Sequence, residues 1–333
     1  MKDNFHIQWH ITNSCNLRCR HCYQNDFSAK DDPPFSQLKK IFENVSAFLN
    51  REDRKLTVNI TGGEVFLYQD WENLISYLYD SPLVKEVGII TNGFFITEKN
   101  LKHLEKFPRI SIKISAEGFE KDSYEFFRGQ GNFNKFIKGV EMLKETDFEK
   151  TLMFTLLETN FSQVEKGVDF LEQYNFDHII IERFIPLGTG KDMKNQIISY
   201  ENWIETARFL LVKCGLENDL SEIIPYRAFM LRLKNAIFDF YGAPCVIGID
   251  GIAVMPDGTV FPCRRLPVKI GNLLEESLEE IWRQSALLEL LRQRKFLKGK
   301  CNTCQQEECL GCRALAYAMT GDFLSEDPLC FVE

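Results

Sequence analysis

The sequence lacks the features of membrane proteins and of nucleic-acid-binding proteins. None of its apolar runs approaches the ~20 residues that a membrane-spanning helix needs. Residues 1–5 lack the apolar core of a secretory signal peptide. Basic side chains are too few to neutralise a run of phosphates, because 40 Lys and Arg face 48 Asp and Glu for a formal net charge of −8. We therefore expect a cytoplasmic protein that binds neither a membrane nor nucleic acid.

A flavin or nicotinamide fingerprint is also missing, so the chain would depend on an external donor for any electron that it uses. Cysteine, by contrast, is abundant, with 11 residues in a chain of 333. Disulfides are rare in a reducing compartment, and metal or redox chemistry becomes the favoured explanation. With 44% hydrophobic residues the chain can bury a sizeable core, and its length suggests two domains of the usual ~150 residues.

The cysteines are concentrated at the two ends of the chain. Three lie near the N-terminus, at Cys15, Cys19 and Cys22. Cys214 stands alone in a helical pattern, where a small buried apolar residue is the better interpretation. The other seven lie in the C-terminal part, at Cys245, Cys263, Cys301, Cys304, Cys309, Cys312 and Cys330. Metal sites are therefore expected only at the two ends.

Short apolar strands alternate with amphipathic helices from residue 5 to about residue 190. The predicted strands cover residues 5–12, 56–61, 86–91, 110–115, 152–157 and 178–184. The predicted helices cover residues 35–49, 71–78, 98–106, 133–143 and 164–174. Such alternation is typical of parallel βαβ units whose strands are buried on both faces. Six repeats predict an α/β fold with a partial (β/α)6 TIM-like barrel, rather than a closed barrel of eight strands.

The pattern changes near residue 190. Residues 200–212 and 225–240 are predicted as two helices that bridge to the C-terminal part. Residues 249–255 and 259–262 are predicted to form a hairpin, because the Asp-Gly pair between them supplies the turn geometry.

One more helix is expected over residues 278–297, and the remainder is predicted as short loops punctuated by cysteine. These loops contain too few apolar residues to fold without a ligated metal. We therefore expect a barrel at 1–190, a helical bridge at 191–244 and a cysteine-rich domain at 245–333.

The N-terminal cysteines have the spacing C-x3-C-x2-C directly after the first predicted strand. Three thiolates this close in one loop can ligate three irons of a [4Fe–4S] cube, which leaves the fourth iron without a protein ligand. An open iron can bind a substrate, whereas electron-carrier clusters usually have all four irons capped. Zinc is the alternative, but it prefers four nitrogen or sulfur ligands in a closed site. Spacing and position together favour an iron–sulfur cluster.

Five residues on the following strands and loops extend this pattern: Gly62, Gly63 and Glu64 close the second strand, Ser115 ends the fourth, and Arg128 precedes a glycine. Together with the three cysteines, they resemble the radical S-adenosylmethionine (SAM) superfamily over about residues 5–190. The resemblance implies that the cysteines hold the catalytic cluster and that the Gly-Gly-Glu motif holds the methionine ammonium of SAM. It also implies that Ser115 contacts SAM and that the guanidinium of Arg128 faces its carboxylate.

The C-terminal cysteines include two CxxC pairs, which alone would suggest zinc ribbons. Seven cysteines, however, are awkward for one zinc site and one short of two closed four-cysteine sites. Their order is similar to the SPASM extension of radical SAM maturases, which carries two auxiliary [4Fe–4S] clusters. The resemblance implies a crossed pattern, with Cys245, Cys263 and Cys312 on auxiliary cluster I and Cys301, Cys304, Cys309 and Cys330 on auxiliary cluster II.

Auxiliary cluster I would then lack a fourth cysteine ligand, because no thiol lies in residues 246–251. Its remaining iron would be open or held by another ligand, with Asp250 or Asp257 nearest in sequence. An open iron could bind the thiolate of a cysteine-containing peptide, because thiolate is a strong, soft ligand for iron.

The resemblance implies three [4Fe–4S] clusters, one of which binds SAM, together with SAM itself. An external donor such as flavodoxin or ferredoxin would supply the electron that cleaves SAM into methionine and a 5′-deoxyadenosyl radical. This radical would take a hydrogen atom from the substrate. The auxiliary clusters would accept an electron from the product radical, bind substrate, or both.

Three functions remain open at this point, and the first of them is favoured. The first is the modification of a ribosomally synthesised peptide by a crosslink or thioether; leader recognition would need a separate leader-binding protein or another surface, because Cys15 leaves no room for a preceding domain. The second is small-molecule chemistry such as oxidative decarboxylation of a tetrapyrrole side chain. The third is a noncatalytic iron–sulfur electron carrier, which has no need of a SAM pocket.

Overall fold

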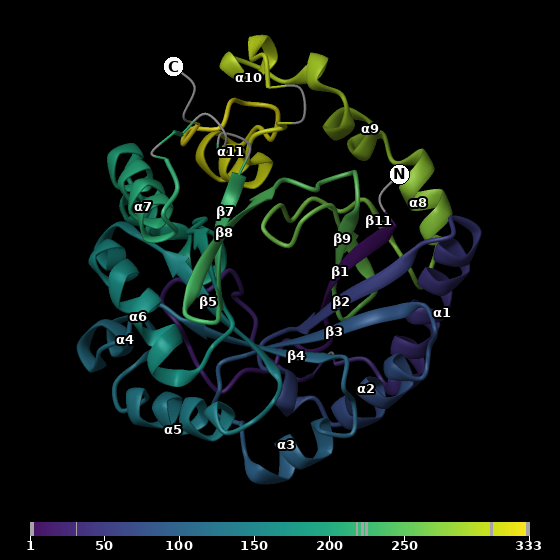
Figure 1. Ribbon diagram of the computed structural model, residues 1–333. Helices are drawn as coiled ribbons and strands as arrows, with labels where there is room; N and C mark the ends of the chain where they lie inside the picture. Colours follow the sequence, from purple (N-terminus) through teal and green to yellow (C-terminus); the bar gives the residue numbers. More distant parts are fainter. Residues whose placement is uncertain are drawn as a thin grey trace.

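The computed structural model describes residues 3–30, 32–217, 219–220, 223, 226–306 and 309–330. Its centre is a curved sheet of eleven strands in the order β11-β10-β9-β1-β2-β3-β4-β5-β6-β7-β8 (Figure 1). Strands β1 to β6 pair in parallel with one another and cover Asn4–His10, Lys55–Thr61, Val84–Thr91, Ile110–Ala116, Glu149–Leu156 and His178–Arg183. The predicted partial barrel is therefore confirmed.

Helices α1 to α6 cover the outer face of these strands in Figure 1. They span Phe35–Arg51, Trp71–Tyr79, Glu98–Leu104, Lys121–Arg128, Phe133–Lys144 and Val164–Tyr174. Helix α4 was not predicted, because only Tyr124 and Phe127 are apolar and buried in its eight residues. Short 3-10 turns lie at Val65–Leu67, Glu158–Gln163, Gly188–Asp192, Lys194–Gln196 and Arg294–Phe296.

The two faces of the barrel strands differ in polarity. On β1, Phe5 and Ile7 are buried in the main apolar core, and Phe5 packs edge-on against Phe48 of α1. The alternate residues His6 and Gln8 instead line an internal cavity. Because successive side chains of a strand point to opposite faces, polar residues can line the interior while the outer face packs against helices.

The prediction of a helix over residues 225–240 is wrong. Residue 225 lies outside the described residues, and the rest forms the antiparallel strands β7 (Tyr226–Lys234) and β8 (Ile237–Pro244). The turn between them places Asn235 and Ala236 at φ of 52° and 60°, the left-handed geometry of a tight hairpin. Its lack of glycine hid the turn, and the short apolar runs fit either a helix or a strand. The bridge is therefore α7 (Tyr200–Lys213) followed by a hairpin on the edge of β6.

The C-terminal part extends the other edge of the same sheet. The predicted second hairpin is present as β9 (Gly251–Val254) and β10 (Thr259–Phe261), followed by β11 (Gly271–Asn272). Strand β9 pairs in parallel with β1, so that Gly251 lies opposite His6. The cysteine-rich part of the chain is therefore continuous with the barrel sheet.

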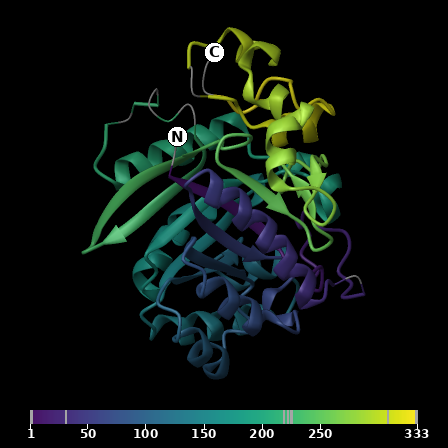
Figure 2. The same cartoon turned by 90° about the vertical axis from the view of Figure 1, so that its right-hand side faces the viewer.

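The single helix predicted over 278–297 is divided in two. Helix α8 (Leu278–Gln284) ends at Ser285, whose side chain accepts a hydrogen bond from Leu288 N and so begins α9 (Ala286–Arg292). The region predicted as loops contains α10 (Lys300–Thr303) and α11 (Arg313–Thr320), which lie at one end of the barrel in Figure 2. No helix within the described residues is both long and apolar enough to cross a bilayer.

Helix α7 is attached to the β7–β8 hairpin through one aromatic stack. Trp203 of α7 is fully buried, and its ring lies 4.2 Å from that of Phe229 on β7 at an angle of 13°. Truncating such a side chain removes a large apolar contact and leaves a cavity.

We therefore expect Trp203→Ala to lower the free energy of unfolding by about 3–5 kcal/mol. Val212→Ala is the control on the same helix, because Val212 is 65% exposed and its truncation should cost less than about 0.5 kcal/mol. Anaerobic denaturant unfolding of the reconstituted proteins measures both, and equal losses would contradict the assigned role of the stack.

Candidate active site

The three N-terminal cysteines lie in the loop after β1, at the carboxyl ends of the barrel strands. Cys15, Cys19 and Cys22 border an internal cavity of about 320 Å³. Gly62, Gly63, Ser115 and Arg128 line the same cavity. The structure therefore brings together every residue of the predicted SAM site except Glu64.

The environment of these thiols suits an iron–sulfur cluster. The backbone N–H of Leu17 lies 3.4 Å from Cys15 Sγ, and that of Gln24 lies 3.4 Å from Cys22 Sγ. Hydrogen bonds of this kind to sulfur stabilise thiolates and tune iron–sulfur clusters. Burial raises the pKa of the Cys19 thiol to about 12, so bound metal would be needed to hold it as a thiolate.

No group of three or more His, Cys, Asp and Glu side chains is arranged around one metal ion in the described ranges. A cube does not require such an arrangement, because each cysteine binds a different iron. Three thiols around a shared cavity are what a cube with one open iron requires.

Gly62 and Gly63 allow the end of β2 to contact the cysteine loop. A Cβ on Gly62 would lie 2.3 Å from the carbonyl oxygen of Thr12, and one on Gly63 would lie 2.1 Å from that of Ser14. Gly63 N and Glu64 N donate to the same two carbonyls at 2.9 and 2.7 Å. Only glycine fits at this approach, so the motif positions the cysteine loop as well as lining the cavity.

Glu64 is fully buried and does not line the cavity. Its carboxylate accepts hydrogen bonds from Thr91 Oγ1 at 2.7 Å, Asn92 N at 2.8 Å and Phe66 N at 3.4 Å. Burial raises the pKa of this carboxyl to about 7. The structure therefore places Glu64 where it holds the end of β3 next to the cavity.

Arg128 is paired with a second buried residue, Glu117. Arg128 Nε and Nη2 both donate to the Glu117 carboxylate, the latter at 3.0 Å, and His21 Nε2 lies 3.1 Å from it. Burial alone would raise the pKa of Glu117, but Arg128 and His21 hold it at about 2. Glu117 follows Ser115 by two residues, and nothing in the sequence indicated that it would pair with Arg128.

A second cavity, of about 760 Å³, lies beside the first. Cys245, Cys263 and Cys312 line it, which is the set that the crossed pattern assigns to auxiliary cluster I. Burial raises the pKa of Cys245 to about 12, with a further contribution from the neighbouring Cys312. Backbone N–H groups also donate to the sulfurs of Cys245 and Cys263.

The two carboxylates that were considered as ligands here differ in position. Asp250 lines the second cavity and is paired with Arg54 at 3.5 Å. Asp257 does not line it, because its carboxylate accepts hydrogen bonds from Thr259 N and Oγ1 within the β9–β10 turn. Of these two residues, only Asp250 is placed to reach a group bound in this cavity.

Three of the four remaining C-terminal cysteines have the same kind of thiolate-supporting contact. Backbone N–H groups lie 3.4 Å from the sulfurs of Cys301, Cys304 and Cys309. Cys301 and Cys330 are buried. Cys214 differs from all of them, because it caps α7 away from both cavities and burial raises its pKa to about 11.

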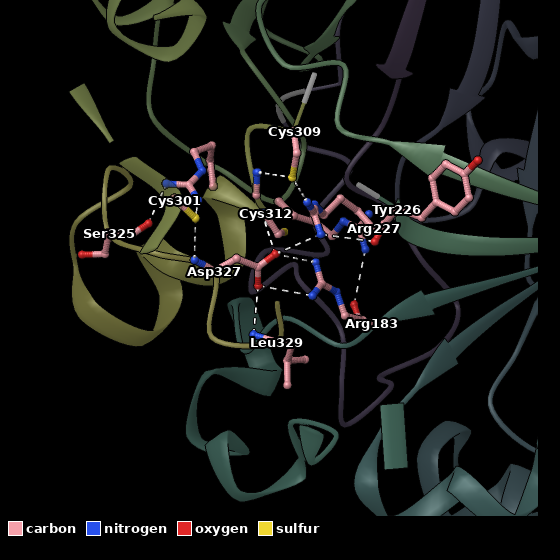
Figure 3. Close-up of polar contacts among 12 residues, drawn as sticks. Arg183, Tyr226, Arg227, Cys301, Cys309, Cys312, Ser325, Asp327 and Leu329 are labelled. Atoms are coloured by element: carbon pink, nitrogen blue, oxygen red, sulfur yellow. Dashed lines mark hydrogen bonds and ion pairs between the residues drawn. The ribbon is translucent and has the colours of Figure 1, made fainter. Parts of the chain in front are cut away.

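One buried carboxylate links these cysteines to the barrel (Figure 3). Asp327 is fully buried and accepts both terminal nitrogens of Arg183, at 3.3 and 3.2 Å, and Arg227 Nη1 at 3.3 Å. It also accepts a hydrogen bond from Cys312 N at 2.8 Å, while Arg227 Nη2 donates to Cys309 Sγ. The sequence contained this residue in its Asp-Pro-Leu-Cys segment, but nothing in the segment indicated its two arginine partners.

The two cavities adjoin inside the barrel. Five residues line both of them: His6, Gln8, Glu182, Arg264 and Arg265. A molecule in one cavity therefore shares its walls with a group bound in the other.

Comparisons with known proteins agree with this geometry. Residues 9–171 match the radical SAM superfamily, and residues 245–310 match the SPASM iron–sulfur cluster-binding domain. The AdoMet-dependent heme synthase of Methanosarcina barkeri is 26% identical over 97% of this chain and 95% of its own. The antilisterial bacteriocin subtilosin biosynthesis protein AlbA of Bacillus subtilis is 25% identical over 91% of this chain and 64% of its own.

The fold is also similar to a solved structure, that of Streptococcus suis SuiB bound to precursor peptide SuiA. The TM-score is 0.74 at 17% identity, over 98% of this chain and 76% of the other. Two domain matches, a shared fold and the assembled cysteine cavity lead to one conclusion. The chain belongs to the radical SAM superfamily and is an enzyme with a SPASM iron–sulfur domain at its C-terminal end.

Proposed function

We propose that the chain cleaves SAM in the first cavity and takes a hydrogen atom from a substrate that lies between the two cavities. One observation supports this above all: the three N-terminal cysteines share one cavity with Gly62, Gly63, Ser115 and Arg128. A noncatalytic electron carrier has no use for such a pocket beside its cluster. When bound, the cluster supplies the electron that cleaves SAM, and SAM supplies the 5′-deoxyadenosyl radical.

The chain's own residues would bind and orient SAM. The backbone of Gly62 and Gly63 borders the cavity and would receive the methionine ammonium, while Ser115 supplies a hydroxyl. Glu64 would act as a positioning residue, because its carboxylate is occupied by the end of β3. Glu117 accepts hydrogen bonds from two nitrogens of Arg128, and the guanidinium would offer its remaining N–H groups to the carboxylate of SAM.

The C-terminal cysteines would hold two auxiliary clusters and bring the total to three. Cys245, Cys263 and Cys312 would ligate the cluster that faces the substrate, and Cys301, Cys304, Cys309 and Cys330 the other. We place the barrel domain at 1–190 and the SPASM domain at 245–333, joined by α7 and the β7–β8 hairpin. An external one-electron donor such as flavodoxin or ferredoxin would reduce the clusters in the cytoplasm.

For the substrate we favour a carboxylate-bearing small molecule such as a tetrapyrrole, whose side chain would be decarboxylated oxidatively. The heme synthase relative supports this choice, since the match extends over nearly the full length of both chains. The second cavity, at about 760 Å³, has the size of a site for a compact organic ligand.

The second candidate substrate is a ribosomally synthesised peptide, modified by a crosslink or thioether. The match to the bacteriocin biosynthesis protein supports it, although that match covers less of the relative. A separate leader-binding protein would then bring the peptide to the enzyme. A cysteine of the peptide could dock at an open iron beside Cys245, Cys263 and Cys312.

Replacing Cys15, Cys19 and Cys22 together with Ala should remove about four of about twelve irons and abolish SAM cleavage. Anaerobic reconstitution with iron and sulfide, followed by metal analysis and assay of 5′-deoxyadenosine, measures both effects. Cys214→Ala is the control and should lose no iron, because Cys214 lies away from both cavities. About four irons in the unaltered protein would refute the auxiliary clusters, and zinc in place of iron would refute all three.

Arg128→Lys should weaken SAM binding roughly 10- to 150-fold and leave the first cluster in place. A lysine cannot hold Glu117 and a second carboxylate with one compact ammonium, and a hydrogen bond to a charged group contributes about 1.5–3 kcal/mol. Equilibrium dialysis with labelled SAM measures the affinity. Arg232→Lys, on the half-exposed side of β7, is the matched control, and equal affinities in the two variants would exclude the role given to Arg128.

A further inference from the structure

The charges that line the two cavities are nearly all paired. Arg128 is paired with Glu117, Arg265 with Glu182 at 3.0 Å, Arg183 and Arg227 with Asp327, and Asp250 with Arg54. Apart from the exposed Asp3, the lining contains no further Asp or Glu. Two cations, Arg264 and Lys113, have no carboxylate within ion-pair distance among the residues that the structure describes.

Arg264 is the more buried of these two cations, with 7% of its surface exposed. Its contacts orient the side chain, and its acidic neighbours are the hydroxyl of Tyr23 and the thiols of Cys22 and Cys263 rather than a carboxylate. Nε donates to His10 Nε2 at 3.0 Å, and the guanidinium lies 4.2 Å from the centre of the Tyr23 ring. Burial and Arg264 hold the pKa of His10 well below its usual range, so that this ring is a neutral acceptor.

An arginine held in this way is suited to bind an anion. A buried guanidinium that lacks a carboxylate partner is costly, and the cost is offset when a ligand supplies that carboxylate. The guanidinium fork matches the two oxygens of a carboxylate. Arg264 also lines both cavities, so an acid bound to it would lie between the N-terminal cysteines and the cavity of Cys245, Cys263 and Cys312.

We propose that Arg264 binds a carboxylate of the substrate where the two cavities meet. Lys113 supplies a second positive charge on β4, two residues before Ser115 and on the same face of the strand. This inference rests on the proposed function and adds the residue that recognises the carboxylate and the place where it binds. The carboxylate comes either from an acidic side chain of a tetrapyrrole or from an acidic residue of a peptide.

Two matched pairs of probes test the proposal on the reconstituted enzyme with SAM, under anaerobic conditions. The first pair is a porphyrin with free propionates and its methyl ester, followed by fluorescence quenching. The second pair is a short labelled peptide containing Glu and the same peptide with Gln, followed by anisotropy. We expect one acid to bind about 10- to 100-fold more tightly than its neutral partner, and that pair identifies the source of the carboxylate.

The preference for the acid should disappear in Arg264→Gln and persist in part in Arg264→Lys, which keeps the charge. Arg232→Gln removes an arginine outside both cavities and should leave the preference unchanged. Equal binding of acid and neutral probe in both pairs would overturn the proposal. An acid preference that survives in Arg264→Gln would overturn it as well. If that variant keeps the preference and only the reduction potentials of its clusters shift, Arg264 serves as a counter-ion for the clusters and the proposal is again overturned.

Cleavage of SAM by dithionite in the absence of probes separates this inference from the proposed function. If the unaltered enzyme forms no 5′-deoxyadenosine, the proposed function fails, and the inference fails with it. If cleavage is normal but no acid is preferred, only the role of Arg264 is refuted. Normal cleavage in the unaltered enzyme, together with an acid preference that is lost in Arg264→Gln, supports both.

Discussion

The ion pairs of Asp327 with Arg183 and Arg227 hold the barrel and the cysteine-rich end together. Arg183 ends β6, Arg227 lies at the start of β7, and Asp327 lies three residues before Cys330. A buried ion pair repays its desolvation only when its remaining hydrogen-bonding groups are satisfied. Asp327 meets this condition through N–H donors from the C-terminal segment, and its pKa is held well below the usual range. Together with the pairing of β9 and β1, this carboxylate therefore fixes the C-terminal cysteines against the barrel.

Arg227 connects the ion pair with Asp327 to the C-terminal cysteines. The same guanidinium is paired with Asp327 and donates to the sulfur of Cys309, and both Cys312 and Cys245 are among its negative neighbours. A donor to sulfur stabilises the more electron-rich state of a cluster. The arginine thus contacts Cys309 while it lies close to Cys245 and Cys312.

The sequence predicted those parts of the site in which residue type alone carries the chemistry. Cysteine spacing and the Gly-Gly pair were sufficient to indicate which residues gather at the first cavity, because thiolate ligation and a close backbone approach each require one kind of residue. The pairing of Glu117 with Arg128 and that of Asp327 with Arg183 were not predictable, because contacts between distant segments leave no local pattern. The β7–β8 hairpin was missed for a different reason, since its turn uses Asn235 and Ala236 where glycine would have signalled it.

The pairing of β1 with β9 has a consequence for biosynthesis. His6 leaves the ribosome about 245 residues before its partner Gly251, which at ~5–20 residues per second is an interval of roughly 10–50 s. Throughout that time β1 presents an open hydrogen-bonding edge next to the loop of N-terminal cysteines. A nascent chain in this state needs protection against edge-to-edge aggregation, and the same open edge leaves its first three thiols accessible to iron–sulfur delivery before the barrel is covered.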